Sequence, residues 1–406
     1  NVDNIEGLLR FSKETLLIRG EDALMDKLIS VHAREAEFQT FTSEQRLIKD
    51  EYEVGQLQAA VDSTGRGFSD VITAMPAAAD HPRGERIVEG AFFGRARLEG
   101  NDIGYTTIAA AGSHACVLHW IRNDGAVRNG ELLLLDAGVE MDSYYTADIT
   151  RTLPVNGKFT PAQRALYMLV YEAQLAGFAA VKPGVPFLEI NRAAQRVLAQ
   201  GLADMGVLTV SAEESMKPEI GLHRRWTLHG VSHHLGLDVH DCEHARQDMY
   251  RDGVLQEGMV LTVEPGLYIQ PDDELFAPEY RGIGIRIEDD VIVTADGCEI
   301  NDSVNVTVYF TPPIPVIPDV LPVCKGASVD ILVSGADTYI WSPNYQINTL
   351  VGSQVTVNPP DDFTYYCDFV NACGTIRDSV RIDVVEASIF AGNDTIICPG
   401  ETATLW

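Results

Sequence analysis

The chain has 406 residues, enough for a large hydrophobic core and for more than one domain. Its formal net charge of −29 at pH 7 argues against nucleic acid or an anionic membrane surface as a partner. No apolar run approaches the ~20 residues that span a bilayer. The opening from Asn1 resembles neither a signal peptide nor a transit peptide, so we expect a fragment or a processed form.

Histidine and cysteine divide the chain into two parts. All ten histidines lie between His32 and His244, whereas five of the seven cysteines lie from Cys298 onward. Histidine without much cysteine is typical of an intracellular catalytic domain, and clustered cysteines among short strands are typical of an oxidised, exported module. We therefore predict a cytoplasmic catalytic part and a C-terminal part suited to a secreted or cell-surface protein.

The N-terminal part begins without recognisable chemistry and then becomes helical. We assign residues 1–45 to the remnant of an N-terminal domain or to a linker. Asp50 followed by Glu53 has the pattern of a capping box, and apolar residues recur behind it at helical spacing. A second helix is expected over 86–98, followed by strand and loop over 106–120.

The segment ELLLLDAGVEMDSYYTADITRT, from Glu131 to Thr152, combines a buried-strand pattern with two carboxylates. Its four leucines predict a strand buried on both faces, yet Asp136 follows them directly, where an unpaired charge is costly. Asp148 lies in a second strand-like run. Two antiparallel strands would bring both aspartates together, where they repel unless a cation or a shared proton lies between them. Surface aspartates beside a hairpin are the alternative interpretation.

Two helices and three strand-like segments follow the hairpin. Thr160 followed by proline predicts the start of a helix that ends near Val181, and a second helix is expected over 186–205. The strand-like segments cover 229–241, 258–269 and 282–294. Helices on one side of a curved, largely antiparallel sheet would form an α+β arrangement.

The last hundred or so residues lack helical periodicity and contain a repeat. NDSVNVTVYF resembles the later RDSVRIDVVEA, and Cys324 and Cys398 begin two similar segments. A period of about 75 residues with many short strands predicts tandem β-sandwich repeats. We expect the last strand of a truncated repeat over 298–312, a nearly complete repeat over 313–388, and the start of a further truncated repeat over 389–406.

Five hard or borderline metal ligands stand in segments rich in apolar residues and glycine. They are Asp136, Asp148, His233, Glu264 and Glu288. Buried acids in this number need compensating positive charge, and Arg286 alone does not supply enough. Four carboxylates and one imidazole favour a pair of Mn²⁺-like ions over thiolate-seeking zinc. Two such ions clamp a bridging hydroxide, which becomes a nucleophile at neutral pH.

Four segments resemble those of Xaa-Pro aminopeptidases, the aminopeptidase P branch of the pita-bread metallopeptidases of family M24. These segments are LLLLDAGVEMDSYYTADITRTLPVNGKFTPAQ, LHGVSHHLGLDVHD, GMVLTVEPGLYI and YRGIGIRIEDDVIVT. The resemblance implies that residues 46–297 form a pita-bread catalytic domain, with a curved, mostly antiparallel sheet covered by helices. The C-terminal part resembles the Ig-like or PKD-like repeats of secreted adhesins, which implies an all-β sandwich.

The same resemblance implies a role for each candidate site residue. Asp136, Asp148, His233, Glu264 and Glu288 would be the metal ligands, with Asp148 and Glu288 bridging the two ions. His119, His229 and His240 fall where the family binds substrate and stabilises the tetrahedral intermediate. Glu264 would also shuttle the proton of the attacking hydroxide, and we count Arg286 among the catalytic residues.

The implied function is hydrolysis of the N-terminal Xaa-Pro bond of peptides by a dinuclear metal site, with Mn²⁺ as the favoured metal. The implied partners are peptides with proline at the second position, and homo-oligomers occur in the family. A prolidase, which cuts only Xaa-Pro dipeptides, is the nearest alternative. A catalytically silent pita-bread scaffold with an adhesion-type tail is the non-enzymatic one.

Several other residues have alternative interpretations. His229 and His233 are four apart, so a helical zinc motif is conceivable, although the neighbouring glycines favour loop and strand. Solvation or a hydrogen-bond partner is the simpler interpretation for three unassigned histidines, His114, His234 and His244. Cys116 and Cys242 are interpreted as packed thiols, because no base is paired with either in the sequence.

The junction between the two parts is abrupt. The family carries an N-terminal α/β domain before the catalytic one, and this chain begins near the end of it. The catalytic sequence then gives way to the repeat at Asp296-Gly297-Cys298 without a linker. We interpret this junction as the product of splicing or mis-assembly rather than as an evolved fusion.

Overall fold

A computed structural model describes residues 15–20, 22–295, 297–299, 317, 322–334, 336, 338–371 and 374–386. The chain divides into two compact units, Asn1–Val306 and Thr307–Trp406. Among the described residues, no helix is both long and apolar enough to cross a membrane.

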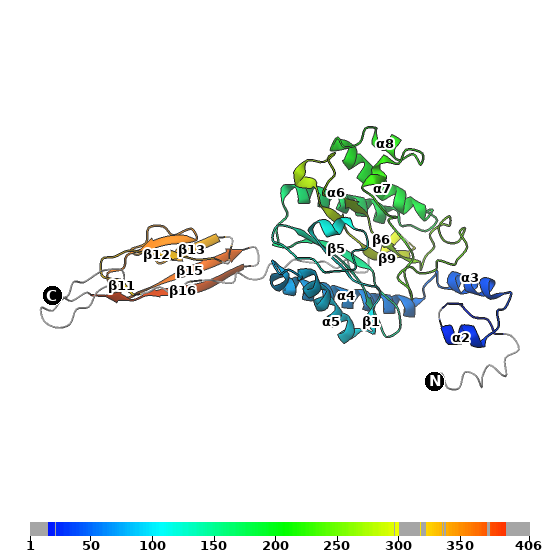
Figure 1. Cartoon of the computed structure of the whole chain (residues 1–406), viewed down its shortest axis with the longest axis horizontal. Helices are drawn as coiled ribbons and strands as arrows, with labels where there is room; N and C mark the ends of the chain where they lie inside the picture. The colour runs from blue at the N-terminus through cyan, green and yellow to red at the C-terminus, as the bar shows by residue number, and fades with distance from the viewer. Residues whose placement is uncertain are drawn as a thin grey trace. The chain divides into compact units, whose positions relative to one another are not determined.

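The first unit contains helices and short strands (Figure 1). Its helices are α2 (Ala23–Leu28), α3 (Glu35–Gln45), α4 (Glu51–Ala78), α5 (Gly84–Glu99), α6 (Pro161–Ala180), α7 (Leu188–Asp204) and α8 (Ala212–Ser215), with 3-10 turns η2 (Gly112–Cys116), η3 (Leu222–Arg225) and η4 (Pro278–Tyr280). Its strands are β1 (Asp102–Ile103), β2 (Ile108–Ala111), β3 (Leu132–Ala137), β4 (Val139–Glu140), β5 (Ile149–Pro154), β6 (Val260–Val263), β7 (Gly266–Tyr268), β8 (Gly284–Arg286), β9 (Asp289–Thr294) and β10 (Gly297–Glu299).

The long helix α4 begins as predicted. The Asp50 carboxylate accepts a hydrogen bond from the Glu53 backbone N–H at 2.9 Å, and the Glu53 carboxylate accepts one from the Asp50 N–H at 2.8 Å. The apolar face of α4 packs against α5, and a Cβ at Gly67 would lie only 2.7 Å from the Phe92 ring. Glycine at this position therefore allows the two helices to approach closely.

The four leucines form a buried strand, and the hairpin prediction is confirmed. Strand β3 pairs antiparallel with β5, with Asp136 opposite Thr150, and β2 covers the other edge of β3. A second sheet has the order β10-β9-β6, and β7 pairs with β8. An antiparallel bridge between Thr150 and Glu288 connects the hairpin sheet to this second group. In Figure 1 the labelled strands β5, β6 and β9 lie between the helix pair α4–α5 and the helix pair α6–α7.

The strand predicted over 229–241 is wrong, because this segment is irregular. Its peptide groups do follow β6, since Thr262 N–H donates to the His233 carbonyl at 2.9 Å and Glu264 N–H donates to Val231 at 2.8 Å. Only His234 and Leu261 form a recognised bridge. A Cβ at Gly236 would lie 2.1 Å from Asp241 Oδ2, so the chain folds back on itself there. The absence of helical turns also rules out the helical zinc motif.

The second unit is all β in its described part. Its strands are β11 (Val323–Cys324), β12 (Val329–Leu332), β13 (Thr338–Ser342), β14 (Gln354–Val357), β15 (Phe363–Asn371), β16 (Gly374–Ile382) and β17 (Val384–Val385). The pair β12–β14 and the sheet β13-β15-β16 share one buried apolar cluster that includes Ile331, Trp341 and Phe369. Two sheets with a common core agree with an all-β unit, while the Ig-like topology stays a prediction.

The domain boundaries also stay predictions. Cys298 and Glu299 pair with Val293 and Ile292 as the edge strand β10 of the first unit, and residues 300–312 lie outside the described residues. The predicted truncated repeat over 389–406 lies outside them as well. Cys324 is disulfide-bonded, whereas Cys367 is a buried free thiol whose pKa is raised by burial to about 11.

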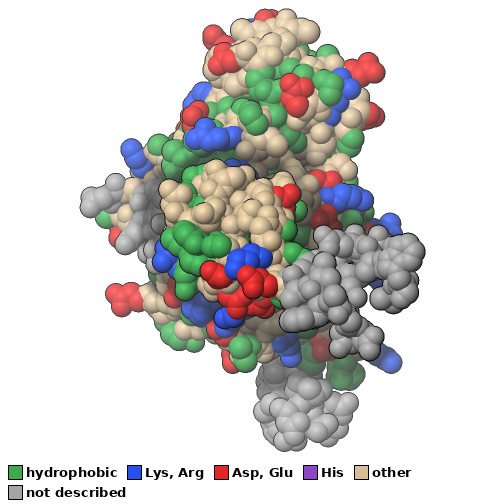
Figure 2. Space-filling model, turned by 90° about the vertical axis from the view of Figure 1, so that its left-hand side faces the viewer, with side chains coloured by type: hydrophobic (Ala, Val, Ile, Leu, Met, Phe, Trp, Pro, Cys, Tyr) green, Lys and Arg blue, Asp and Glu red, His purple; other side chains and the backbone are tan. Residues whose placement is uncertain are grey.

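Surface charges of both signs are interspersed. On the face drawn in Figure 2, acidic and basic side chains alternate with hydrophobic ones. Several acidic side chains gather in the lower part of this face, with basic side chains beside them.

The separation into two units predicts the effect of removing the second one. A chain that ends at Glu299 keeps β10 on the edge of β9 and keeps every predicted ligand, because the last of them is Glu288. We expect its metal content, measured by elemental analysis, to equal that of the full chain. A shortened chain that loses metal while the full chain keeps it would contradict this separation.

Candidate metal centre and active site

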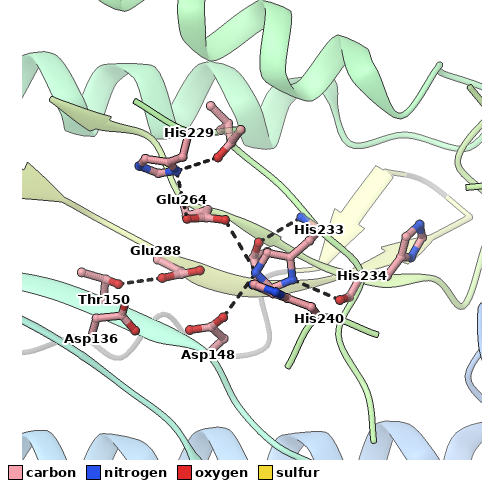
Figure 3. Close-up of polar contacts among 12 residues, drawn as sticks. Asp136, Asp148, Thr150, His229, His233, His234, His240, Glu264 and Glu288 are labelled. Atoms are coloured by element: carbon pink, nitrogen blue, oxygen red, sulfur yellow. Dashed lines mark hydrogen bonds and ion pairs between the residues drawn. The ribbon is translucent and has the colours of Figure 1, made fainter. Parts of the chain in front are cut away.

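One cavity of the first unit, with a volume of about 520 Å³, collects all the predicted site residues. The five candidate ligands Asp136, Asp148, His233, Glu264 and Glu288 line it, together with His119, His229, His240 and Arg286. Asp136 lies in β3 and Asp148 directly precedes β5, while Glu264 and Glu288 stand at breaks between strands. Side chains from four separate chain segments therefore point into one space (Figure 3).

The tightest cluster consists of Asp148, His233 and Glu288, whose potential ligand atoms all lie within 4.8 Å of one another. His233 Nε2 is 3.3 Å from Asp148 Oδ2 and 3.6 Å from Glu264 Oε1. The other ring nitrogen, Nδ1, donates to the His234 carbonyl at 3.1 Å (Figure 3). This backbone contact fixes the ring so that Nε2 faces the carboxylates, as is usual for metal-binding histidines.

Tyr105 connects the fourth carboxylate to this cluster. Its hydroxyl lies 2.6 Å from Asp136 Oδ1 and 2.5 Å from Asp148 Oδ1. A phenol has a single hydrogen, so it can donate to only one of these two carboxylates at a time. Burial raises the pKa of Tyr105 well above its usual value, which keeps the hydroxyl a donor.

The carboxylates of the cavity carry more negative charge than their surroundings offset. Burial, followed by the charges of Asp148 and Glu264, raises the pKa of Glu288 well above its usual value. Burial also raises the pKa of Asp136, although Arg286 opposes it. Burial alone would lower the pKa of His233, but the Asp148 hydrogen bond and the Glu264 charge raise it to about 9.

These observations fit a divalent cation. A cation of charge two would offset the repulsion among the buried acids and favour their ionised forms together. The donor set is rich in oxygen, with one imidazole nitrogen, and such a set suits Mn²⁺ and similar ions. The residues present can therefore hold metal, and a second ion is compatible with the five side chains.

Arg286 orders the part of the cavity around Asp136 and His229. Its guanidinium contacts the Asp136 carboxylate, and its Nη1 donates to the Tyr268 hydroxyl at 2.8 Å. The Tyr268 hydroxyl lies 2.8 Å from His229 Nε2, while His229 Nδ1 lies 2.7 Å from the Gly230 carbonyl. With Nδ1 as the donor, Tyr268 donates to Nε2, and a continuous chain runs from arginine to imidazole.

His229 and His240 flank the cluster, and His119 lies at the exposed rim. His229 Nδ1 is also 3.3 Å from Glu264 Oε2, so these two residues are in contact. The His240 ring packs edge-on against His233 with centroids 4.5 Å apart. Burial, followed by the charge of His233, lowers the pKa of His240, which favours a neutral ring at this position.

The remaining histidines lie outside the cluster. His244 is exposed, and His114 contacts Glu85 at 2.7 Å while stacking on Trp120. His234 is buried and stacks on Phe187, and burial lowers its pKa to about 3. Cys116 and Cys242 are buried thiols, as predicted, and burial raises the pKa of each to about 12.

Glu85 anchors the loop that carries His119. This fully buried carboxylate accepts hydrogen bonds from the Ala111 and Gly125 backbone N–H groups at 2.9 and 2.6 Å and from Trp120 Nε1 at 2.9 Å. Both ends of the loop are therefore tied to one point on α5. Nothing in the local sequence distinguishes Glu85 from a surface acid, because its partners are distant in the chain.

Sequence reasoning also missed the residues that hold the ligands. Thr150 Oγ1 donates to Glu288 Oε2 at 2.6 Å, and Asp290 Oδ2 accepts from the Asp148 N–H at 3.1 Å. Tyr105 belongs to the same group, because it contacts Asp136 and Asp148, and Tyr268 holds His229. For Thr150 the sequence held one signal. Alternate residues of a strand share a face, and Thr150 is two residues from Asp148.

The family is decided by comparison with known proteins. The model of metallopeptidase family M24 matches residues 55–295, which include every candidate site residue. The chain belongs to metallopeptidase family M24. Its first unit accordingly has the α+β pita-bread fold of that family, which confirms this part of the fold prediction.

Several relatives of this M24 chain are named Xaa-Pro aminopeptidases. It is 57% identical over 277 residues to Xaa-Pro aminopeptidase 1 of Streptomyces coelicolor, which covers 68% of the chain and 55% of the relative. It is 47% identical over 195 residues to the Xaa-Pro aminopeptidase of Escherichia coli, covering 48% of the chain and 43% of the relative. The M24 chain thus spans about half the length of the curated relatives it matches.

Solved structures give the same family. Aminopeptidase PepP of Pseudomonas aeruginosa superposes with a TM-score of 0.61 at 40% identity, over 66% of this M24 chain and 59% of the other. Proline aminopeptidase P II of Yersinia pestis superposes with a TM-score of 0.64 at 35% identity, over 74% and 71% of the two chains. These coverages correspond to the first unit rather than to the whole chain.

The cluster predicts different effects for two neighbouring buried residues. Asp148→Ala removes a central carboxylate and should abolish most of the metal bound per chain. His234→Ala should leave metal content unchanged and keep activity within a few-fold, while it destabilises the fold by about 1–3 kcal/mol. Elemental analysis and urea unfolding measure the two effects. Metal loss from the His234 variant as large as that from the Asp148 variant would show that the wrong histidine was assigned.

A second prediction concerns the tyrosine between the aspartates. Tyr105→Phe keeps the ring but removes the hydroxyl that holds Asp136 and Asp148. Because partners of metal ligands contribute about 10- to 100-fold to affinity, we expect a loss of that size in a metal titration. The far-ultraviolet circular dichroism should stay unchanged. Unaltered metal affinity in this variant would assign Tyr105 to packing alone.

Proposed function

We propose that this chain removes the N-terminal residue from peptides that have proline at the second position. The observation that carries the proposal is the convergence of four carboxylates and His233 with His119, His229 and His240 on one cavity. The names of the relatives support the same activity, and the family membership supports hydrolysis as the reaction class.

The Xaa-Pro bond sets the chemical problem. It is a tertiary amide, so its nitrogen has no hydrogen to donate and leaves as a secondary amine that must receive a proton. Hydrolysis adds hydroxide to the carbonyl carbon, breaks the bond from carbon to the proline nitrogen, and transfers one proton to that nitrogen. The site must therefore accept a proton on one side of the carbonyl and return it on the other.

Divalent cations bound by the five ligands would polarise the carbonyl and lower the pKa of water. Among the chain's own groups, Glu264 would accept the water proton and pass it to the proline nitrogen. Burial would raise the pKa of Glu264, but the hydrogen bond from His229 and the charge of that residue lower it, so the carboxylate begins in its basic form. This agrees with the proton-shuttle role that we predicted for Glu264.

Three histidines would position the substrate. His229 is oriented by Tyr268 and Arg286, and His240 by its packing against His233. His119 approaches from the loop anchored by Glu85. The imidazoles of His119 and His240 could donate to the scissile carbonyl and to the oxyanion that replaces it.

We further propose Mn²⁺ as the metal and a pair of ions as its number. The oxygen-rich donor set supports Mn²⁺ over zinc. Zinc-substituted E. coli aminopeptidase P has been solved with product, so zinc is accommodated in that relative. For this chain we expect Mn²⁺ to restore activity after chelation better than Zn²⁺.

Two other functions compete with this proposal. A prolidase would cut only Xaa-Pro dipeptides, and a silent scaffold would bind peptide without cutting it. The filled ligand positions favour an enzyme over a scaffold. A neighbouring cavity of about 930 Å³, which shares the lining residue His229 with the site, favours substrates longer than a dipeptide.

The test is hydrolysis of Xaa-Pro and Xaa-Pro-Xaa peptides by the full chain. After exhaustive chelation we expect no turnover, and after addition of Mn²⁺ we expect the tripeptide to be cleaved at the Xaa-Pro bond. Asp148→Ala serves as the inactive control. Cleavage of the dipeptide alone would establish a prolidase, and full activity after chelation would refute the metal-dependent mechanism.

For the second unit we propose an Ig-like or PKD-like sandwich over 313–388. The shared core of its two sheets supports this architecture. The cytoplasmic origin of the catalytic part, the secreted or surface origin of the repeat, and homo-oligomer formation stay predictions.

A further inference from the structure

A second cavity opens beside the site and is larger than it. Its volume is about 930 Å³, against about 520 Å³ for the site cavity. The two share His229, Gly230, Ser232, Glu243 and Tyr250 as lining residues. The two cavities are therefore adjacent, because the same residues line both.

The charge of the second cavity is opposite to that of the chain. Three arginines line it, Arg192 on α7, Arg224 in η3 and Arg251 after Tyr250, whereas Glu243 is the one acid among its described lining residues. The chain as a whole carries −29. A local excess of arginine on such a protein is a specific feature of this cavity rather than a consequence of composition.

These arginines are available to a ligand. All three are exposed, and among the described residues neither Arg224 nor Arg251 has an acidic partner within ion-pair distance. Arg192 has a long contact of 3.6 Å to Glu189 of its own helix. Guanidinium groups bind carboxylates through paired hydrogen bonds, so three of them around one cavity form a receptor for that group.

The direction of the substrate decides what enters this cavity. An aminopeptidase, as in the function proposed above, binds the free amine and the first residue at the metal end. Only residues that follow the proline can then extend past His229 into the second cavity. We infer that the arginine-lined cavity binds carboxylates of the peptide downstream of proline, which makes acidic Xaa-Pro peptides the preferred substrates.

Two sources of carboxylate share this chemistry, an acidic side chain and the C-terminal carboxylate of a short peptide. Ala-Pro-Glu-Glu and Ala-Pro-Lys-Lys, both with amidated ends, test the side chains. Ala-Pro-Ala-Ala with a free or an amidated end tests the terminus. The measured quantity is kcat/KM of the full, Mn²⁺-loaded chain, separated into kcat and KM.

The wild-type chain should prefer the carboxylate-bearing member of at least one pair by about tenfold, mainly through KM, since two or three exposed charge pairs contribute at this level. The double variant Arg224→Glu, Arg251→Glu should lose or reverse the preference. Arg164→Glu, an exposed arginine of α6 outside the cavity, is the matched control and should keep it. The dipeptide Ala-Pro, which ends at proline, should bind the double variant and the wild type with KM values within about twofold of each other.

The possible results separate this inference from the function on which it rests. Equal kcat/KM values within both pairs, with clear cleavage of all four peptides, would overturn the inference and leave the aminopeptidase proposal intact. A preference that survives in the double variant would overturn it as well. No cleavage of any Xaa-Pro peptide by the loaded wild-type chain would overturn both.

Discussion

The concentration of negative charge in a buried cavity is the constraint on which the first unit depends. Asp136, Asp148 and Glu288 are nearly inaccessible to solvent, and Glu264 stands beside them. Charges removed from water are costly unless they are paired, and like charges in contact cost more. The fold accommodates them with short hydrogen bonds from Tyr105 and Thr150, with Arg286, and with geometry that suits a divalent cation.

The surrounding framework holds this arrangement in place. Arg151 on β5 pairs with Asp289 on β9 at 2.5 Å, and its guanidinium also donates to the Glu288 carbonyl at 2.7 Å. This buried contact ties the hairpin to the second sheet at the position of the metal ligands. Glu85 connects both ends of the loop that carries His119 to α5. Breaking one partner of such a pair leaves an uncompensated buried charge, so these positions tolerate few substitutions.

Local rules predicted the elements that depend on local interactions. The capping boxes at Asp50 and Thr160 begin α4 and α6, because the side chains that close each helix lie within one turn of it. The leucine run became the central strand β3. The segment 229–241 was mispredicted, because its alternating apolar residues follow β6 without a regular ladder, and Gly236 folds against Asp241.

The sequence by itself determined the chemistry of the site. The acids and histidines in apolar surroundings, and the resemblance of their segments to a family, identified the nine residues that the structure brings to one cavity. Only the tertiary structure decided which groups support them, since Tyr105, Glu85 and Asp290 act on partners far away in the chain and have no local pattern. It also placed Arg192, Arg224 and Arg251 around a second cavity. Their effect depends on proximity in space, which a linear pattern of charges does not encode.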